Sequence, residues 1–277
     1  MSTEDLAGNL EDRQGHDTVK ANFVTWTMVA GIEDYIATAG QSVTITGNDE
    51  ANKITTTRYD DTIFGGTGDT LAGGAGDDTY IFTGNNVNLI ETATGGYDSA
   101  YVSADSFVIG DNLEYVRFVQ KITQDGLHAT VTGNSRDNTI VVGGGLSGVD
   151  VDAGAGNDTL TVDGGVYIAD SVRLTGGAGA DTFAFINAAV SQMQATFVDF
   201  TPGEDHLQFP GLSLSLKAGP LPQSLFHVGP ANSAGFHYDQ STGTLSYWFQ
   251  FGTQFEDHVV AQFTNHAALT FHDFIVV

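Results

Sequence analysis

The sequence predicts an all-β protein: a right-handed parallel β-roll followed by a C-terminal antiparallel β cap. Glycine-rich segments recur about every nine residues, and each is followed by a triplet with a large apolar residue at its centre. The 277 residues include 35 Gly but only 5 Pro, without the three-residue period of collagen. Acidic side chains are mainly Asp, with 26 Asp and 8 Glu, and Asp favours turns and hard cations over helices.

Charge and composition narrow the function classes. Only 9 Lys and Arg accompany 34 Asp and Glu, and the formal charge of −25 argues against nucleic acid and anionic membranes as partners. A hydrophobic content of 41% with 18 Phe predicts a folded core. Without Cys there are no disulfides, thiolate metal sites or Cys nucleophiles. The N-terminal residues predict no signal peptide, and no apolar run is long enough to predict a transmembrane helix.

Nonapeptide repeats are the clearest motif. Residues 73–81 and 176–183 follow the pattern Gly-Gly-x-Gly-x-Asp-x-U, where U is a large apolar residue. Residues 153–160 carry a slightly altered copy, and residues 59–63 and 65–71 carry shorter ones. Five successive U positions are spaced by 9, 8, 9 and 9 residues: Ile54, Ile63, Leu71, Tyr80 and Leu89. This spacing predicts that these side chains point inward from short strands.

The repeat length has a physical reason. Gly turns the chain at low steric cost and adopts positive φ, while the triplet forms a short strand. Two nonapeptides make one coil, so residues 40–183 correspond to about eight coils of ~4.8 Å each. Turns two repeats apart stack on one edge, where carboxylates and turn carbonyls can enclose Ca²⁺, which prefers six to eight oxygens. The predicted ligands are the motif aspartates and turn glycines: Asp61, Asp69, Asp78, Asp158, Asp181, Gly74, Gly76, Gly154, Gly156, Gly177 and Gly179.

A longer repeat begins near residue 15. The sequence Gly-His-Asp-Thr-Val at residues 15–19 corresponds to Gly-Tyr-Asp-Ser-Ala at residues 96–100. Glu33 and Glu114 occupy equivalent positions in this repeat, which suggests a structural role for both. Between residues 84 and 140, Asp is often missing from the sixth motif position. We therefore expect those coils to carry no calcium and to depend on stacked apolar residues.

With these motifs, the chain resembles the RTX family of haemolysin-type calcium-binding repeat proteins. Its last part is similar to the C-terminal region of serralysin-type proteins, and the matching pieces are residues 179–183, 198–205, 238–245 and 269–277. The resemblance implies Ca²⁺ as the cofactor, with a late calcium site at Asp199 and Asp205. It also implies an uncleaved C-terminal export signal, type I secretion machinery as a partner, and a secreted, extracellular or cell-surface location.

The repeats and the resemblance divide the chain into three expected parts. These are a tail at residues 1–14, RTX β-roll repeats at residues 15–183, and a cap with the secretion signal region at residues 184–277. Many relatives carry a catalytic domain before the repeats, but the early start of the repeats predicts none here. The metalloprotease motif H-E-x-x-H and the motif G-x-S-x-G are absent from the sequence. We therefore predict that the chain is not an enzyme.

An aromatic segment from Tyr247 to Phe255 differs from the polar hairpin tip of RTX relatives. Strand alternation places Tyr247, Phe249 and Phe251 on one face and Trp248 on the other. Two interpretations stay open. The segment is either a buried cap over the open end of the roll or an exposed strand that mediates self-association.

The predicted function is that of an extracellular calcium-binding structural or surface protein. It folds on Ca²⁺ binding and self-associates through residues 247–255 or its coil ends, as an S-layer-like, matrix, adhesin or filament subunit. One alternative is a calcium-binding C-terminal module of a secreted hydrolase or epimerase. Another is a small secreted effector that binds glycans or membranes.

Overall fold

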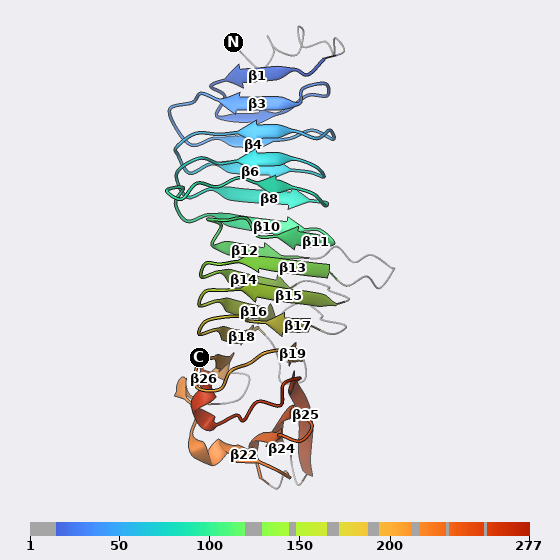
Figure 1. The fold of residues 1–277 in the computed structure, drawn as a ribbon, viewed down its shortest axis with the longest axis vertical. Helices are drawn as coiled ribbons and strands as arrows, with labels where there is room; N and C mark the ends of the chain where they lie inside the picture. The colour runs from blue at the N-terminus through green and yellow to red at the C-terminus, as the bar shows by residue number, and fades with distance from the viewer. Residues whose placement is uncertain are drawn as a thin grey trace. The chain divides into compact units, whose positions relative to one another are not determined.

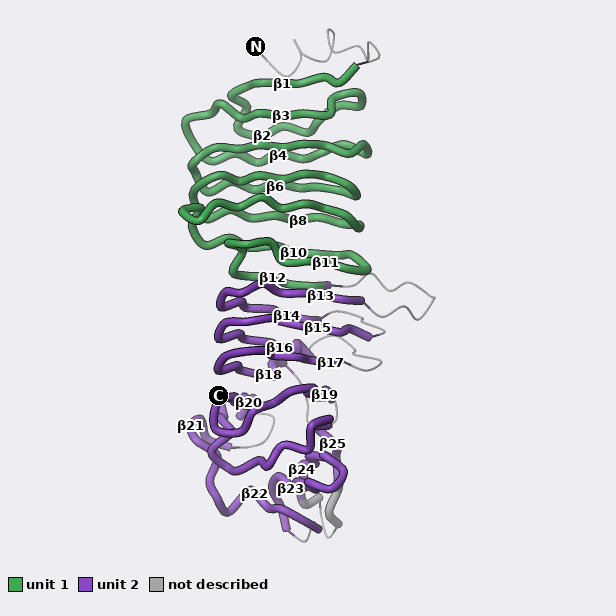
Figure 2. The backbone as a smooth tube through the Cα atoms, in the orientation of Figure 1, with its two compact units in different colours: residues 1–118 green, residues 119–277 purple. Residues whose placement is uncertain are grey.

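The computed structural model describes residues 15–119, 129–143, 148–164, 172–187, 194–211, 216–230, 233–251 and 254–277. The chain divides into two compact units, residues 1–118 and residues 119–277, which Figure 2 colours separately. In both units, short β-strands alternate with turns.

Unit 1 is a parallel β-solenoid whose strands pass alternately into two sheets (Figure 1). The first sheet contains β1 (Thr18–Ala21), β3 (Asp34–Ala37), β5 (Lys53–Thr55), β7 (Thr70–Ala72) and β9 (Asn88–Leu89) in that order. The second contains β2 (Thr25–Thr27), β4 (Thr44–Thr46), β6 (Thr62–Gly65), β8 (Thr79–Thr83), β10 (Ser99–Ser103) and β12 (Tyr115–Phe118), while β11 (Ser106–Val108) lies between β10 and β12 in the chain. Neighbouring strands pair in parallel, so the predicted β-roll is confirmed.

The core of unit 1 is a set of columns formed by the central residue of each strand. Register places Ile54 beside Leu71 and Ile63 beside Tyr80, and these four side chains are fully buried. Leu89, which was expected to point inward in the same way, is only half-buried. It belongs to the two-residue strand β9 at the end of its sheet, so only β7 pairs with it.

Unit 2 has the same solenoid pattern, followed by an antiparallel part. One sheet runs β13 (Ala129–Asn134), β15 (Val149–Gly154), β17 (Val172–Thr175), β19 (Ala195–Phe197), β25 (Gln254–Phe263), β24 (Thr244–Phe251), β23 (Gly235–Asp239) and β22 (Phe226–Val228). The other runs β14 (Thr139–Gly143), β16 (Thr159–Asp163), β18 (Thr182–Ile186), β20 (His206–Phe209), β26 (Phe274–Val276) and β21 (Gly219–Pro220). Two short 3₁₀ turns are η2 (Gln223–Leu225) and η3 (Phe271–Asp273).

The predicted antiparallel cap is confirmed, because β24 pairs antiparallel with both β23 and β25. The last strand, β26, does not belong to this hairpin. It pairs in parallel with β20 and antiparallel with β21, so the C-terminal residues form an inner strand of this sheet. Fully buried aromatic rings fill the unit beneath the cap: Phe183, Phe185, Phe197, Phe200, Phe209, Phe236, Phe263 and Phe274. Such rings bury large areas and fix the cap against the coils.

Candidate calcium-binding turns

Buried and half-buried acidic side chains form a ladder along one edge of unit 1. Each stands just before a strand of the same sheet, and one of its carboxylate oxygens accepts a hydrogen bond from a backbone N–H of the preceding coil. Asp61 accepts from Val43 N at 2.7 Å, Asp78 from Asp61 N at 2.7 Å, and Asp98 from Asp78 N at 2.8 Å. Glu114 accepts from Asp98 N at 2.9 Å. The ladder therefore ties each turn to the next along the roll.

Glu33 makes the same type of contact as Glu114, as their equivalent repeat positions predicted. Its carboxylate accepts from Asp17 N at 2.7 Å, and Asp17 corresponds in the long repeat to Asp98. Both glutamates therefore have a structural role in capping the N–H of an aspartate one coil earlier.

Unit 2 repeats the ladder. Asn138 N donates to Asp158 at 2.7 Å, Asp158 N to Asp181 at 2.8 Å, and Asp181 N to Asp205 at 2.9 Å. Asp273, just before β26, accepts from Gly203 N at 2.8 Å. All four aspartates are buried, so these hydrogen bonds replace hydration of the carboxylates.

The second carboxylate oxygen separates these aspartates into two classes. In the first class it accepts from a backbone N–H of its own turn, at 2.6–3.0 Å: Asp61, Asp69, Asp205 and Asp273. In the second class it is buried and has no hydrogen-bond partner: Asp78, Asp98, Asp158 and Asp181. Because a buried polar atom without a partner is costly, a further ligand at the second class would stabilise the fold.

Glycine creates the space around the unpartnered oxygens. A Cβ at Gly73 would lie 2.0 Å from Asp78 Oδ2, and a Cβ at Gly176 would lie 2.2 Å from Asp181 Oδ2. Gly74 adopts a φ of 107°, and a Cβ there would lie 2.0 Å from Thr57 O of the neighbouring turn. Any larger residue at these positions would fill the region where the carboxylate meets the turn backbone.

The other predicted glycines make equally close approaches between stacked turns. A Cβ on Gly177 would lie 1.9 Å from Gly154 O, and a Cβ on Gly179 would lie 1.9 Å from Gly156 O. Gly76 has a positive φ, as do Gly154, Gly156, Gly177 and Gly179. The turns therefore place backbone carbonyl oxygens of one coil close to the glycines of the next.

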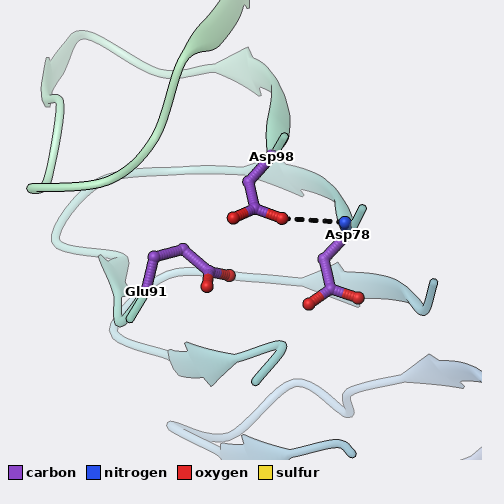
Figure 3. A group of neighbouring side chains, drawn as sticks. All are labelled: Asp78, Glu91 and Asp98. Carbon is purple, nitrogen blue, oxygen red and sulfur yellow. Dashed lines mark hydrogen bonds between the residues drawn. The ribbon is translucent and has the colours of Figure 1, made fainter. Parts of the chain in front are cut away.

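Figure 3 shows an acidic cluster formed by Asp78, Glu91 and Asp98 in unit 1. Each of these residues offers a carboxylate oxygen within 4.8 Å of the others. Glu91 is half-buried and comes from the turn after β9. Its carboxylate also contacts the hydroxyl of Tyr80, which in turn accepts from Gly73 N at 2.7 Å. Two of the three carboxylates carry a buried oxygen without a partner.

Burial disfavours the charged form of the carboxylates in these turns. Burial, with further contributions from nearby acidic groups, raises the pKa of Asp78 to about 8 and that of Glu91 to about 7. Burial also raises the pKa of Asp158 to about 7 and the pKa of Asp98 and Asp181 above its ordinary range. A bound cation would stabilise the charged carboxylates in the same positions.

The donor set fits calcium. It consists of carboxylate and carbonyl oxygens from Gly-rich turns, the ligands that Ca²⁺ prefers, and the unpartnered oxygens give the ion a place in the structure. The acidic cluster and these turns are therefore consistent with calcium binding.

Not every predicted ligand lies in such an environment. Asp61, Asp69 and Asp205 have both oxygens bonded to backbone N–H groups, so their carboxylates are satisfied without an ion. Asp199 is half-buried and accepts from Gly176 N at 3.0 Å and from Gly177 N at 2.8 Å. It therefore orders the turn of Asp181 from the outside.

Sequence reasoning missed Asp98 and Glu91. Asp98 lies in the stretch expected to carry no calcium, yet it has a buried, unpartnered oxygen like those of the intact motifs. A signal was present, because Gly96-Tyr97-Asp98 keeps the end of the repeat pattern. Glu91 had no such signal, since its carboxylate reaches the turn of Asp78 from an irregular segment.

The comparisons with known proteins agree with this architecture. Residues 51–276 match the family described as Peptidase M10 serralysin C terminal, which is typical of secreted proteins. No curated protein matches the chain. Within the described residues, no helix has the length and apolar character needed to cross a membrane. Since the match covers most of the residues and both sets of glycine-rich turns, the chain belongs to the serralysin C-terminal family of the M10 peptidases.

Proposed function

We propose that this chain is an extracellular structural or surface protein whose β-roll folds when Ca²⁺ binds to its turns. The observation that carries the proposal is the buried, unpartnered oxygen of Asp78, Asp158 and Asp181 in glycine-rich turns. With a net charge of −25, the compact chain repels itself, and calcium supplies the missing countercharge. Because the stacked turns exist only in the folded chain, calcium binding energy becomes folding energy.

The place of the C-terminus supports folding after export. Phe274 and Val276 of β26 are buried, and the strand pairs with β20. If residues 269–277 serve as the type I export signal, a folded chain hides part of that signal. Extracellular modules bind calcium at about 10⁻⁴–10⁻³ M, so the low calcium of the cytosol would leave the chain unfolded and exportable.

Circular dichroism of the full chain tests calcium-dependent folding. We expect a largely unfolded spectrum in excess chelator near neutral pH and a β spectrum at about 10 mM Ca²⁺, above the range for extracellular modules. Magnesium at the same concentration is the control, because its smaller ion demands octahedral geometry and keeps its waters. Equal β content in chelator and in calcium would overturn the proposal.

The self-association part of the proposal rests on strand edges. Tyr247 is buried and its ring lies 4.9 Å from that of Phe236, which supports the buried-cap interpretation for this end of the aromatic segment. The side chains of Phe251 and Phe255 lie outside the described residues. Among the described strands, β1 pairs only with β3, so its other edge offers unpaired backbone groups to another chain. Calcium-induced oligomers in light scattering would support assembly, and a monomer at all concentrations would contradict it.

A second candidate function is a calcium-binding module of a secreted hydrolase, because the matching family is the C-terminal part of a peptidase family. We propose that the present residues contribute no catalysis of their own. A casein hydrolysis assay of the calcium-loaded chain with added zinc tests this. Turnover above a heat-denatured control would assign the chain an activity and overturn the non-enzymatic proposal.

A further inference from the structure

The antiparallel cap has one apolar face and one polar face. Register pairs His237 with Ser246 and Asp239 with Thr244 between β23 and β24, and pairs Trp248 of β24 with Asp257 of β25. Since side chains alternate along a strand, these residues share one side of the sheet. The residues between them, including Phe236, Tyr238 and Leu245, are buried in the core. The polar side is therefore not needed for packing against the coils.

A cavity of about 580 Å³ lies over this polar side, within the size range of small-molecule sites. The turn at Gly229 and Pro230 forms one wall. The sheet supplies the other wall, which consists of two aromatic rings, two threonine hydroxyls and two carboxylates. These belong to His237, Trp248, Thr242, Thr244, Asp239 and Asp257. These residues come from all three strands and the hairpin turn, so the cavity exists only when the cap is folded.

The floor of the cavity is rigid and aromatic. The ring of Trp248 lies 5.5 Å from that of His237, which stacks at 4.8 Å on His227. His237 Nε2 donates to Ser233 O at 2.7 Å, because a carbonyl can only accept. Nδ1 of the same ring is buried without a hydrogen-bond partner. This part of the lining therefore presents the indole of Trp248 beside the imidazole of His237.

The walls offer acceptors and hydroxyls. Asp239 is held by Ser241, whose N and Oγ donate to its Oδ1 at 2.9 and 2.7 Å, and these bonds lower its pKa. Thr242 Oγ1 donates to Thr244 Oγ1 at 2.9 Å, and Thr244 Oγ1 donates to Gln262 Oε1 at 3.1 Å. Within the described part of the chain, the carboxylate of Asp257 makes no hydrogen bond and is exposed. Carboxylates accept from hydroxyl groups, and threonine hydroxyls both donate and accept.

The charge of the cavity selects against anions. No Lys or Arg follows Lys217 in the sequence, and two carboxylates line the cavity. Phosphates and carboxylates would meet repulsion there. A metal is not favoured either, because among the described residues the three-residue cluster with metal-binding spacing is the one in unit 1. A ligand that suits an indole face and two carboxylates has a flat apolar side and several hydroxyl donors.

We propose that this cavity binds a neutral sugar residue, with its C–H face on Trp248 and its hydroxyls donating to Asp239 and Asp257. None of the lining residues belongs to the calcium turns, so the calcium-folded chain would also attach to a neutral polysaccharide. The apolar face of a sugar packs on an aromatic ring, and the surrounding hydroxyls supply orientation.

Fluorine NMR tests the proposal on the full chain in calcium buffer. The sequence has 2 Trp, so 5-fluorotryptophan labelling gives one signal from Trp248 and one from Trp26, which is buried in unit 1 and serves as an internal control. The probes are the methyl glycosides of glucose, galactose, mannose and N-acetylglucosamine. Each is added up to about 10 mM, which is tenfold above a dissociation constant of about 1 mM. We expect at least one glycoside to shift the Trp248 signal saturably and to leave the Trp26 signal unchanged.

Calorimetry with that glycoside then tests the contacts. Asp257→Asn should weaken binding about five- to tenfold, because a charge-assisted hydrogen bond is lost. Asp152→Asn removes the same charge from an exposed position on β15 and should have no effect. Three outcomes would overturn the proposal: no glycoside shifts Trp248, tetramethylammonium shifts it where glycosides do not, or Asp257→Asn binds as tightly as the wild type.

Discussion

Two stacked turns of unit 1 carry the same buried aspartate but satisfy its second oxygen differently. Asp61 Oδ2 accepts from Thr57 N, four residues earlier, at 3.0 Å. The position four residues before Asp78 is Gly74, with a φ of 107°, and Asp78 Oδ2 has no partner. A residue with positive φ directs its N–H differently from one with negative φ, so glycine at this position removes the internal donor. The difference suggests that glycine converts a self-contained turn into one that needs a cation.

Unit 2 follows the same rule. Asp205 accepts from Thr201 N, four residues earlier, at 2.7 Å. Asp158 and Asp181 instead follow Gly154 and Gly177, both at positive φ, and both keep an unpartnered oxygen. Asp98 is an exception, because the residue four positions before it is Thr94 and not a glycine. Its oxygen is unpartnered all the same, and the carboxylate lies beside that of Glu91.

The largest effect should come from removing two of the aspartates whose second carboxylate oxygen has no partner. Asp78→Ala combined with Asp181→Ala should lower the number of bound calcium ions and raise the calcium concentration at the folding midpoint. Each lost site costs about 3 kcal/mol when calcium is about 100-fold above its dissociation constant. Calorimetric titration measures the number of sites, with Asp152→Asn as the charge control. An unchanged number in the double variant would contradict the assignment of these turns.

Removing an aspartate whose second carboxylate oxygen is bonded within its own turn should destabilise the fold without changing calcium binding. Asp61→Ala leaves Val43 N and Thr57 N without their acceptor, at a cost of about 1–3 kcal/mol for each buried donor. Urea unfolding should show the same loss of unfolding free energy at two calcium concentrations. These are about 1 mM, the top of the range for extracellular modules, and about 10 mM, which is above that range. A loss that shrinks as calcium rises would place Asp61 among the calcium ligands.

Protonation should partly replace calcium in the turns whose aspartates keep an unpartnered oxygen. Burial raises the pKa of Asp78 to about 8 and that of Asp158 to about 7. The folded chain then holds protons that an unfolded carboxyl, with a pKa near 4, releases. This stability is fully present below about pH 4 and is lost as the pH rises through about 7–8.

Circular dichroism in calcium-free buffer measures this effect. The β content should be higher at about pH 5.5 than at about pH 8.5. With calcium present the trend should reverse, since protons compete with calcium for the carboxylates. A β content that does not change with pH in calcium-free buffer would mean that these groups are already compensated.

Neutralising Glu91 should give the smallest effect. Glu91→Gln removes one charge from the cluster with Asp78 and Asp98, so calcium affinity should fall by about tenfold at that site, the size of a charge-assisted contact. Glu50→Gln is the control, because Glu50 is exposed and accepts from Gly31 N outside the cluster. Equal calcium affinity in both variants would show that Glu91 takes no part in binding.

The sequence alone determined the features that repeat. The nonapeptide period placed Ile54, Ile63, Leu71 and Tyr80 in the core, because a short period requires each turn to stack on an equivalent turn. It also located Asp78, Asp158 and Asp181 in their glycine-rich turns, while the resemblance to serralysin-type proteins predicted the antiparallel cap. These are local rules, in which a residue's role follows from its position within the repeat.

Only the tertiary structure decided the features that depend on contacts between non-equivalent segments. Whether an aspartate keeps an unpartnered oxygen depends on the direction of one N–H in its turn, which the spacing of Asp residues does not reveal. The approach of Glu91 to Asp78, the pairing of β26 with β20 and the cavity over Trp248 each join segments with no shared repeat position. Their geometry follows from how the irregular turns and the cap pack, since no periodic pattern specifies those contacts.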